Sequence, residues 1–294
     1  MLKIYASKGH GGFEPTPDLI QVKYFNDGTP NITIDFQSML VLKDISITWI
    51  FDAGRWEKDL FALQCIMDEM KASGGGKNFL PVYLYMPYIP NARMDRRTLD
   101  SGRVFTLKTF ARLVNDMGFD GIYVLDPHSD VSLALIERCK VDESIPGILH
   151  RVERILPEGA VPLWVFPDAG AMHRYRDDMH SDDMIFGEKV RDPMNDHITG
   201  YALYGGEKVE GRHVIVVDDI IAHGYTMLFL LQEIWKHNPA SVKVFATHIE
   251  DSFKDGKLFD ALNKGELKAE IYTTPSIKRS WSADTVNFPF DDKI

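Results

Sequence analysis

The chain has 294 residues, 45% hydrophobic and 26% charged, which is long enough for one large domain or two ordinary ones. Its net charge of −10 argues against nucleic acid as the main partner, although local basic clusters could bind small phosphorylated molecules. Two cysteines, Cys65 and Cys139, exclude a cysteine metal site and favour a reducing setting. No stretch approaches the roughly 20 apolar residues of a membrane span, so we expect a cytoplasmic protein with no membrane partner.

Short β-rich runs alternate with longer amphipathic runs, the pattern of an α/β fold with a parallel sheet. In chain order, strands are expected at 31–36, 45–53, 79–87, 121–126, 162–168, 213–219, 242–248 and 269–274. Helices are expected at 57–72, 106–117, 227–237 and 257–263, and the SGGGK run at 73–77 predicts the end of the first. The Pro- and Gly-containing stretch 141–159 is the best linker, which predicts domains at 1–148 and 149–294.

Four of the expected strands end in polar motifs, where open α/β sheets bind their ligands. The motifs are MPYIPNARMDRR at 86–97, LDPHSD at 125–130, FPDAGA at 166–171 and VVDDIIAHGYT at 216–226. Each motif taken alone is a weak signal of function.

The aspartates in these motifs have ordinary structural explanations as well. Asp218 and Asp219 suit a helix cap followed by a solvated turn, and Asp168 before AGA suits a helix cap. The buried strand that leads into the first pair weakens the turn explanation. Two carboxylates followed by a small loop would instead suit a polar ligand with a phosphate.

The histidine and arginines also leave two interpretations open. His128 fits an ordinary surface histidine or a partner of phosphate or magnesium. Arg93, Arg96 and Arg97 fit a solvated basic turn or spaced contacts to a polyphosphate.

Read in order, the motifs resemble those of the phosphoribosyl pyrophosphate synthetases, also called ribose-phosphate pyrophosphokinases. PYIPNARMDRR resembles PYFPYARQDRK, DPHSD resembles DLHAD, PDAGA resembles PDAGG, and VDDIIAHGYT resembles VDDIIDTGGT. YFNDG at 24–28 resembles RFSDGE, and EKVR at 188–191 falls where the family has its catalytic flexible loop. Six motifs in the correct order span most of the chain.

The resemblance implies an α/β fold of two phosphoribosyltransferase-type domains, each with a largely parallel sheet flanked by helices. It implies transfer of the β,γ-pyrophosphate of ATP to the C1 hydroxyl of ribose 5-phosphate, with release of AMP and with Mg²⁺ as cofactor. The family generally assembles through dimers into larger rings, so a homo-oligomer, dimer or hexamer, is expected.

The resemblance also assigns roles to residues in the second half. Asp218 and Asp219 would accept hydrogen bonds from the ribose hydroxyls. The loop that follows would cradle a phosphate at a helix start; it consists of Ala222, His223, Gly224, Tyr225 and Thr226. Lys189 and Arg191 would be catalytic, closing over the transferred group and stabilising its charge.

In the first half, the resemblance implies an ATP site. Its expected residues are Phe25, Asp27, Arg93, Asp95, Arg96 and His128. Phe25 would stack on adenine from a neighbouring subunit. His128, which is also expected to be catalytic, and Asp168 match positions that hold magnesium.

Structural alternatives stand beside these roles too. Lys189 and Arg191 fit a solvated loop, because GEKVRDPMND is less basic than the family's loop, and Phe25 fits a core aromatic. His173 and His180 lie in a His-, Asp- and Arg-rich stretch, for which a polar helix and loop is favoured over a metal cluster.

The departures from the family pattern concern the acceptor. Ala222, His223 and Tyr225 replace residues of a compact phosphate loop, which removes polar contacts and adds bulk. An acceptor whose 5-phosphate is already esterified, such as ADP-ribose, would suit this loop and could stack on an aromatic side chain. Met94 and Thr29 also differ from the family and predict changed nucleotide contacts.

Three classes of function therefore remain open. The leading one is a pyrophosphokinase acting on ADP-ribose or on free ribose 5-phosphate. A phosphoribosyltransferase would explain the VVDDIIAHGYT motif but not the arginine motif or DPHSD. A non-catalytic regulatory homologue would explain the altered loop, but not the retention of the metal-side residues and the Lys189–Arg191 pair.

Overall fold

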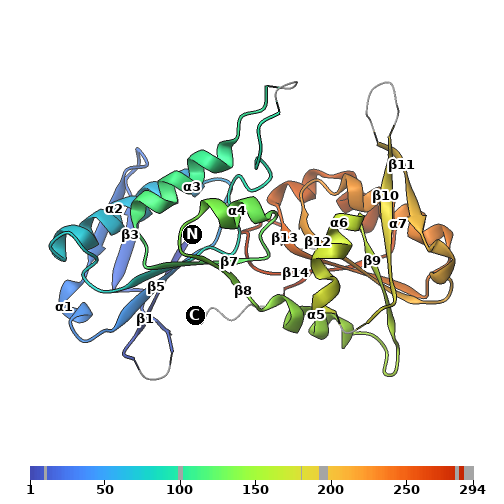
Figure 1. The fold of residues 1–294 in the computed structure, drawn as a ribbon, viewed down its shortest axis with the longest axis horizontal. Helices are drawn as coiled ribbons and strands as arrows, with labels where there is room; N and C mark the ends of the chain where they lie inside the picture. Colours follow the sequence, from blue (N-terminus) through green and yellow to red (C-terminus); the bar gives the residue numbers. More distant parts are fainter. Residues whose placement is uncertain (10–11, 99–101, 180, 192–197, 282–284, 288–294) are drawn as a thin grey trace. The chain divides into compact units, whose positions relative to one another are not determined.

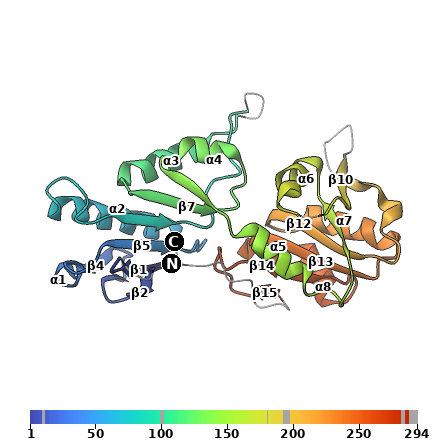
Figure 2. The same ribbon diagram turned by 60° about the horizontal axis from the view of Figure 1, so that its bottom comes forward.

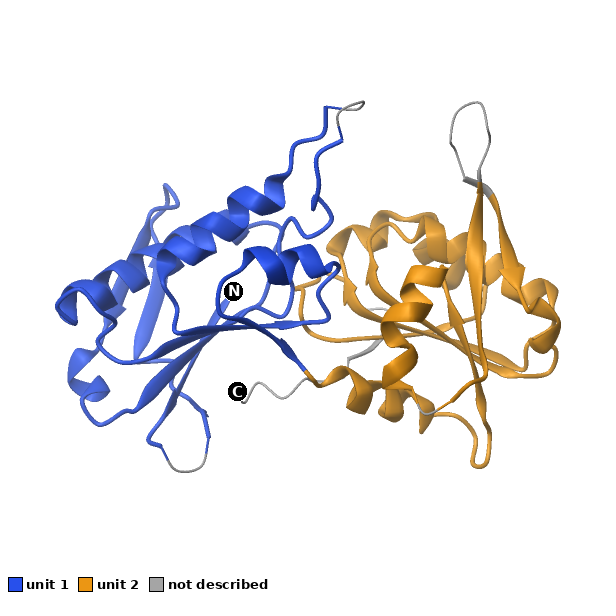
Figure 3. Ribbon diagram, viewed as in Figure 1, with its two compact units in different colours: residues 1–142, 291–294 blue, residues 143–290 orange. Residues whose placement is uncertain are grey.

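The computed structural model describes residues 1–294 except 10–11, 99–101, 180, 192–197, 282–284 and 288–294. The described chain forms two compact units, residues 1–142 and 143–290 (Figure 3). Helix α5 (Ile145–Glu153) begins the second unit, in the stretch expected to act as a linker. Pro146 lies in its first turn, where proline is tolerated because the first N–H groups need no helical partner.

The first unit is built on a six-stranded sheet in the order β2-β1-β5-β6-β7-β8. Strands β5 to β8 run parallel, and β1 is antiparallel to β5 and to the short β2. The strands are β1 (Leu2–Ser7), β2 (Glu14–Pro15), β5 (Asp44–Trp49), β6 (Val82–Tyr85), β7 (Gly121–Leu125) and β8 (Cys139–Asp142).

A separate antiparallel hairpin, β3 (Ile20–Tyr24) and β4 (Pro30–Ile34), carries the YFNDG motif in its turn. The helices of this unit are α1 (Phe36–Met39), α2 (Trp56–Ser73), α3 (Thr106–Met117) and α4 (Asp130–Leu135). Helices α2 and α3 pack side by side (Figures 1 and 2). Their apolar stripes, including Met67 and Phe110, meet Ile45 and Ile47 of β5 in one buried core.

The second unit is built on a seven-stranded sheet in the order β11-β10-β9-β12-β13-β14-β15. All neighbouring pairs are parallel except β10 with β11. The strands are β9 (Pro162–Phe166), β10 (Met184–Arg191), β11 (Ile198–Tyr204), β12 (His213–Ile221), β13 (Ser241–Ile249), β14 (Glu270–Thr273) and β15 (Thr285–Asn287).

Helices line both faces of this sheet, which is why its central strands carry long apolar runs, such as residues 214–217 of β12. One face packs on α7 (Tyr225–Lys236) and α8 (Lys257–Asn263), with Val216 and Leu230 fully buried between them. On the other face, Tyr175 of α6 (Ala169–Tyr175) stacks on Phe166 with ring centroids 6.3 Å apart. Short 3-10 turns, η1 (Arg176–Asp178), η2 (Gly206–Lys208) and η3 (Asp251–Asp255), complete the unit.

The expected α/β class, with two domains of largely parallel sheets flanked by helices, is confirmed. None of the helices among the described residues has the length and apolar character needed to span a bilayer. The expected strand at 31–36 is present as β4, but it belongs to the separate hairpin and not to the parallel sheet. One local expectation is wrong: Glu188–Arg191, expected in a loop, lies in strand β10, because β11 supplies cross-strand partners that the local sequence does not reveal.

Candidate active site

The two adjacent aspartates lie inside strand β12, three residues or fewer before its carboxyl end. The side chain of Asp219 is buried, and its Oδ2 lies 3.4 Å from Nη1 of Arg174 on helix α6. Asp218 is half-buried, and its Oδ1 accepts a hydrogen bond from the Asp219 N–H at 3.0 Å. The pair therefore does not form a solvated turn. We call Asp218 and Asp219 the acidic ledge, which lies at the carboxyl edge of the sheet.

Charge accumulates around Asp218. Burial raises its pKa well above the ordinary carboxyl value, and the neighbouring Asp219 and Asp168 carboxylates raise it further. Such a position favours hydrogen-bond donors or a cation as its ligand. Arg174, which the sequence did not single out, supplies one cation to this ledge.

The expected phosphate loop, Ala222–Thr226, joins β12 to the start of α7. Gly224 is the N-cap of α7 and has φ of +78°, a conformation that glycine adopts at no steric cost. A Cβ there would also lie 3.1 Å from Leu258 and 3.2 Å from Phe253. The free N–H groups of the first turn of α7, a twelve-residue helix, are the backbone feature that binds phosphates.

A second glycine supports the loop from behind. A Cβ on Gly256, between η3 and α8, would lie 2.0 Å from the carbonyl oxygen of His223. The close approach of Gly256 therefore fixes the path of the loop, which the sequence did not reveal.

Two aromatic rings stand on the outside of the loop. His223 and Tyr225 lie with ring centroids 6.3 Å apart and planes 24° apart. Tyr225 is 49% exposed. Their rings are thus available to a ligand beside the phosphate loop.

Asp168 follows strand β9 and caps helix α6. Its Oδ1 accepts a hydrogen bond from the Ala171 N–H at 2.9 Å, so the helix-cap interpretation is confirmed. The residue is exposed, and it raises the pKa of Asp218 electrostatically. Asp168 therefore lies at the same carboxyl edge as the acidic ledge.

Lys189 lies on strand β10, directly opposite Tyr201 of β11. The Tyr201 side chain is buried, and its hydroxyl donates to the carbonyl oxygen of Pro167, the residue before Asp168. Arg191 ends β10, and its side chain lies outside the described residues, as does His180. His173 is exposed on helix α6.

In the first unit, Phe25 and Asp27 lie in the β3–β4 turn. Phe25 is 58% exposed, so the core-aromatic alternative is wrong. Asp27 Oδ1 accepts a hydrogen bond from the Thr29 N–H at 2.9 Å, and this bond lowers the pKa of the carboxyl. The turn therefore presents an aromatic ring to solvent.

The remaining residues of the expected ATP site lie at strand ends of the same unit. Arg93, Asp95 and Arg96 follow β6, and Nε of the exposed Arg96 lies 3.2 Å from Oδ1 of Asp95. His128 is half-buried between β7 and α4. Two residues before it, Asp126 is buried and has a φ of +45°.

Of the two residues expected to hold magnesium, Asp168 lies in the second unit, at the same edge as the ribose-binding aspartates, and His128 lies in the first. Asp168, Asp218 and Asp219 offer carboxylate oxygens, the ligands that Mg²⁺ prefers. Among the described residues, no group of three or more histidine, cysteine, aspartate or glutamate side chains is placed to hold a metal ion. Mg²⁺ is commonly held by one or two carboxylates together with waters and substrate phosphates.

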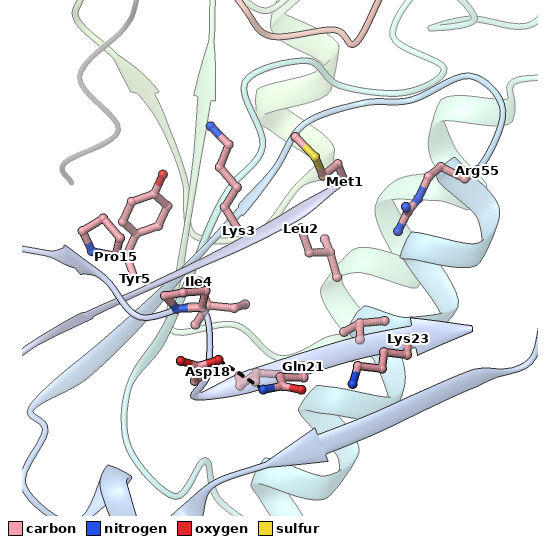
Figure 4. A pocket seen from close by; sticks show the side chains of 13 residues that line it. Met1, Leu2, Lys3, Ile4, Tyr5, Pro15, Asp18, Gln21, Lys23 and Arg55 are labelled. Carbon is pink, nitrogen blue, oxygen red and sulfur yellow. Dashed lines mark hydrogen bonds between the residues drawn. The ribbon is translucent and has the colours of Figure 1, made fainter. Parts of the chain in front are cut away.

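The first unit also contains a cavity of about 630 Å³ between β1 and β3 (Figure 4). Lys3, Lys23 and Arg55 contribute to its wall, and Gln21 donates to Asp18 Oδ1 at 3.2 Å. None of the residues with an expected role in the reaction lines this cavity.

Comparison with known proteins places this geometry in context. The family described as phosphoribosyl transferase domain matches residues 184–291. The ribose-phosphate pyrophosphokinase of Sulfurisphaera tokodaii is 27% identical over 204 residues, covering 68% of this chain and 67% of that protein. That of Sulfolobus acidocaldarius is 27% identical over 231 residues, covering 78% of this chain and 74% of that protein.

A solved structure shares the fold. The phosphoribosylpyrophosphate synthetase from Mycobacterium smegmatis aligns with a TM-score of 0.67 and 18% identity, covering 92% of this chain and 85% of that one.

Proposed function

We propose, because the chain belongs to the ribose-phosphate pyrophosphokinase family, that it transfers the β,γ-pyrophosphate of ATP to the C1 hydroxyl of a ribose 5-phosphate moiety and releases AMP. The observation that carries the proposal is the carboxyl edge of the second sheet. There the Asp218–Asp219 ledge leads directly into a loop that opens helix α7. A ribose phosphate needs both features, carboxylates for its hydroxyls and free N–H groups for its phosphate.

The other residues have roles that fit this reaction. Lys189 and Arg191 would stabilise charge on the transferred group, an interaction that strengthens in the transition state. Phe25, Asp27, Arg93, Asp95, Arg96 and His128 would bind ATP, and His128 would also be catalytic. Asp168 and His128 would hold Mg²⁺, which when bound supplies charge neutralisation on the triphosphate.

We propose further that the acceptor is ADP-ribose in preference to free ribose 5-phosphate. The loop offers Ala222, His223 and Tyr225 where an enclosed phosphate dianion would need small residues and polar side chains. The His223 and Tyr225 rings are exposed beside the loop. They suit an acceptor whose 5-phosphate continues into a second nucleoside that can stack on them.

One experiment tests the reaction and the acceptor together. The protein is incubated with ATP, Mg²⁺ and either ribose 5-phosphate or ADP-ribose, and products are followed by phosphorus NMR and chromatography. AMP is expected as the nucleotide product, because attack is directed at the β-phosphorus. Stoichiometric ADP would indicate ordinary phosphoryl transfer and would refute the mechanism.

The acceptor is judged by kcat/KM. We expect ADP-ribose to exceed ribose 5-phosphate by at least about tenfold, equivalent to roughly 1.4 kcal/mol of transition-state binding. The combined replacement of Ala222 by Asp, His223 by Thr and Tyr225 by Gly should shift the preference toward ribose 5-phosphate. Equal or better activity of the unmodified protein with ribose 5-phosphate would refute the ADP-ribose proposal but leave the pyrophosphokinase proposal intact.

A further inference from the structure

We propose that Tyr201 is a positioning residue that ties the β10–β11 hairpin, which carries Lys189, to the segment that carries Asp168. Its effect on turnover rests on the proposed function, whereas the tie itself is a property of the fold. Tyr201 lies in none of the sequence motifs. Its proposed role can be seen only from the register of β11 with β10.

The tie has two ends in the structure. At one end, Tyr201 is the direct cross-strand partner of Lys189, so the backbones of the two residues lie side by side in the antiparallel ladder. At the other end, the Tyr201 hydroxyl donates to the carbonyl oxygen of Pro167, which immediately precedes Asp168. One side chain thus connects the strand of the expected catalytic lysine with the expected metal-binding aspartate.

The ring of Tyr201 packs against a glycine that leaves room for it. A Cβ on Gly187 of β10 would lie 2.4 Å from Cε1 and 2.7 Å from Cδ1 of Tyr201. The same Cβ would lie 3.3 Å from Leu230 of helix α7. The ring therefore lies directly on the backbone of Gly187, and any larger residue there would push the ring away.

The surroundings keep the hydroxyl available as a donor. Tyr201 is only 6% exposed, and burial raises the pKa of its hydroxyl, with smaller contributions from Asp168 and Asp218. The hydroxyl therefore stays protonated near neutral pH. Removing the Tyr201 hydroxyl would leave the Pro167 carbonyl oxygen without this hydrogen bond. Leaving a buried polar group unpaired costs free energy.

The same strand offers a matched control. Tyr204 is 50% exposed, and its hydroxyl donates to Oε2 of Glu188 at 2.6 Å. That hydrogen bond stays within the hairpin and does not reach the Asp168 segment. Tyr201→Phe and Tyr204→Phe therefore remove the same atom from the same strand, but only the first cuts the tie.

The first measurement does not depend on activity. Amide hydrogen exchange is followed in the full-length protein over peptides covering 166–171 and 184–191. Tyr201→Phe should speed exchange in both peptides, while Tyr204→Phe should leave 166–171 at the wild-type rate. If Tyr201→Phe leaves both peptides unchanged, the tie does not exist, whatever reaction the protein catalyses.

The second measurement tests what the tie does. In the AMP-release assay, Tyr201→Phe should lower kcat about tenfold with KM for ATP within about twofold, because the loss is in transition-state geometry. It should also raise the Mg²⁺ concentration for half-maximal rate at least about threefold, less than the 10–100-fold typical of partners that contact a metal ligand directly. Gly187→Ala should reproduce both changes by displacing the ring.

The outcomes separate the two proposals. Altered exchange in Tyr201→Phe beside an inactive wild-type protein would refute the proposed function and support the tie. An active wild-type protein in which Tyr201→Phe and Tyr204→Phe have the same kcat and the same Mg²⁺ dependence would refute the positioning role. A simple loss of folded protein would lower the apparent kcat without changing the Mg²⁺ dependence, and would also refute it.

Discussion

The two adjacent aspartates of strand β12 have unequal surroundings. Asp219 is paired with Arg174, whereas Asp218 is raised in pKa by burial and by the carboxylates of Asp219 and Asp168. A ligand that brings hydroxyl donors or a cation would relieve this repulsion. The unliganded protein therefore carries a destabilising charge at the position where its ligand would bind, a common conflict between stability and function.

Asp218→Asn should stabilise the unliganded protein. Because the folded-state pKa of Asp218 is raised, the folded state binds this proton more tightly than the unfolded state. Stability is therefore lost as pH rises from about 4, the ordinary carboxyl value, through the raised pKa. The variant should melt about 2–4 °C above wild type at pH 7 without magnesium, and the difference should shrink toward pH 4.

Thermal unfolding in EDTA across this pH range measures the effect, and Asp251→Asn is the control of opposite sign. Burial acts to raise the pKa of Asp251, but hydrogen bonds from Ser280 and Lys254 outweigh it and lower the pKa. Its contribution is therefore present above the ordinary carboxyl pKa and is lost in acid. That variant should be less stable than wild type at pH 7. Equal melting of Asp218→Asn and wild type at all pH values would contradict the argument.

Lys189→Ala and Arg191→Ala should each lower kcat by about 100-fold or more while leaving the dissociation constant of ATP within about twofold. The reason is that both cations are expected to act on charge that develops only during transfer. Steady-state kinetics and equilibrium ATP binding check this. Lys208→Ala is a matched control in the same unit, since Lys208 pairs with Asp183 at 3.7 Å. Unchanged turnover in both variants would show that Lys189 and Arg191 have no catalytic role.

At the scale of elements, the phosphate loop depends on its contact with the turn between η3 and α8. Gly256→Ala would place a methyl group 2.0 Å from the His223 carbonyl oxygen, so the loop backbone must move. Overpacking of this kind costs about 1–3 kcal/mol, and we expect about a tenfold weaker affinity for the ribose-phosphate substrate. Calorimetric binding measures it.

Gly147→Ala in helix α5 is the matched control, because nothing lies within 4 Å of a Cβ at that position. It should leave acceptor affinity unchanged, since alanine is favoured over glycine in a helix. If Gly256→Ala binds the acceptor as tightly as wild type does, the contact between Gly256 and His223 does not fix the loop.

The local sequence pattern predicted the bounds of the helices better than it predicted how the strands pair. The expected helices at 106–117 and 257–263 coincide with α3 and α8 because their periodicity and end signals are local. The expected loop at 188–191 is instead strand β10, because pairing with β11 depends on a partner some ten residues away. Asp168 and Asp218 could be found because each comes after an apolar run of a strand. Arg174 and Tyr201 could not, since their partners are set by tertiary packing.

At the scale of the whole molecule, the expected binding residues divide between the two units. The expected ATP-binding residues from Phe25 to His128 lie in the first unit, and the ribose-phosphate residues from Asp218 to Thr226 lie in the second. Each unit supplies its residues from the carboxyl ends of parallel strands, with the addition of the β3–β4 turn in the first. The proposed reaction would draw on expected residues of both units, and the turn carrying Phe25 presents its ring to solvent.

Phe25 allows the expected oligomer to be tested through activity. If Phe25 stacks on the adenine bound by a neighbouring subunit, Phe25→Ala should weaken ATP binding by roughly 1–3 kcal/mol, the usual contribution of stacking on a base. Lys189→Ala should remain nearly inactive at all ATP concentrations. In a mixed dimer, one site combines the unchanged Lys189 of the Phe25→Ala subunit with the unchanged Phe25 of the Lys189→Ala subunit. That site is intact. Mixed dimers of the two variants should therefore regain activity that neither variant has alone.

The experiment is co-expression of the two variants with different tags, followed by purification through both tags and assay at low ATP. In a randomly mixed dimer population about one quarter of the sites would be intact, and in double-tagged dimers about half. Doubly substituted Phe25→Ala, Lys189→Ala protein mixed with wild type is the control, because its heterodimers contain no site with both residues. If Phe25 serves its own subunit, this control instead keeps one intact site in each heterodimer, and the two-variant dimer contains none. The two arrangements therefore predict opposite rankings of the same two preparations.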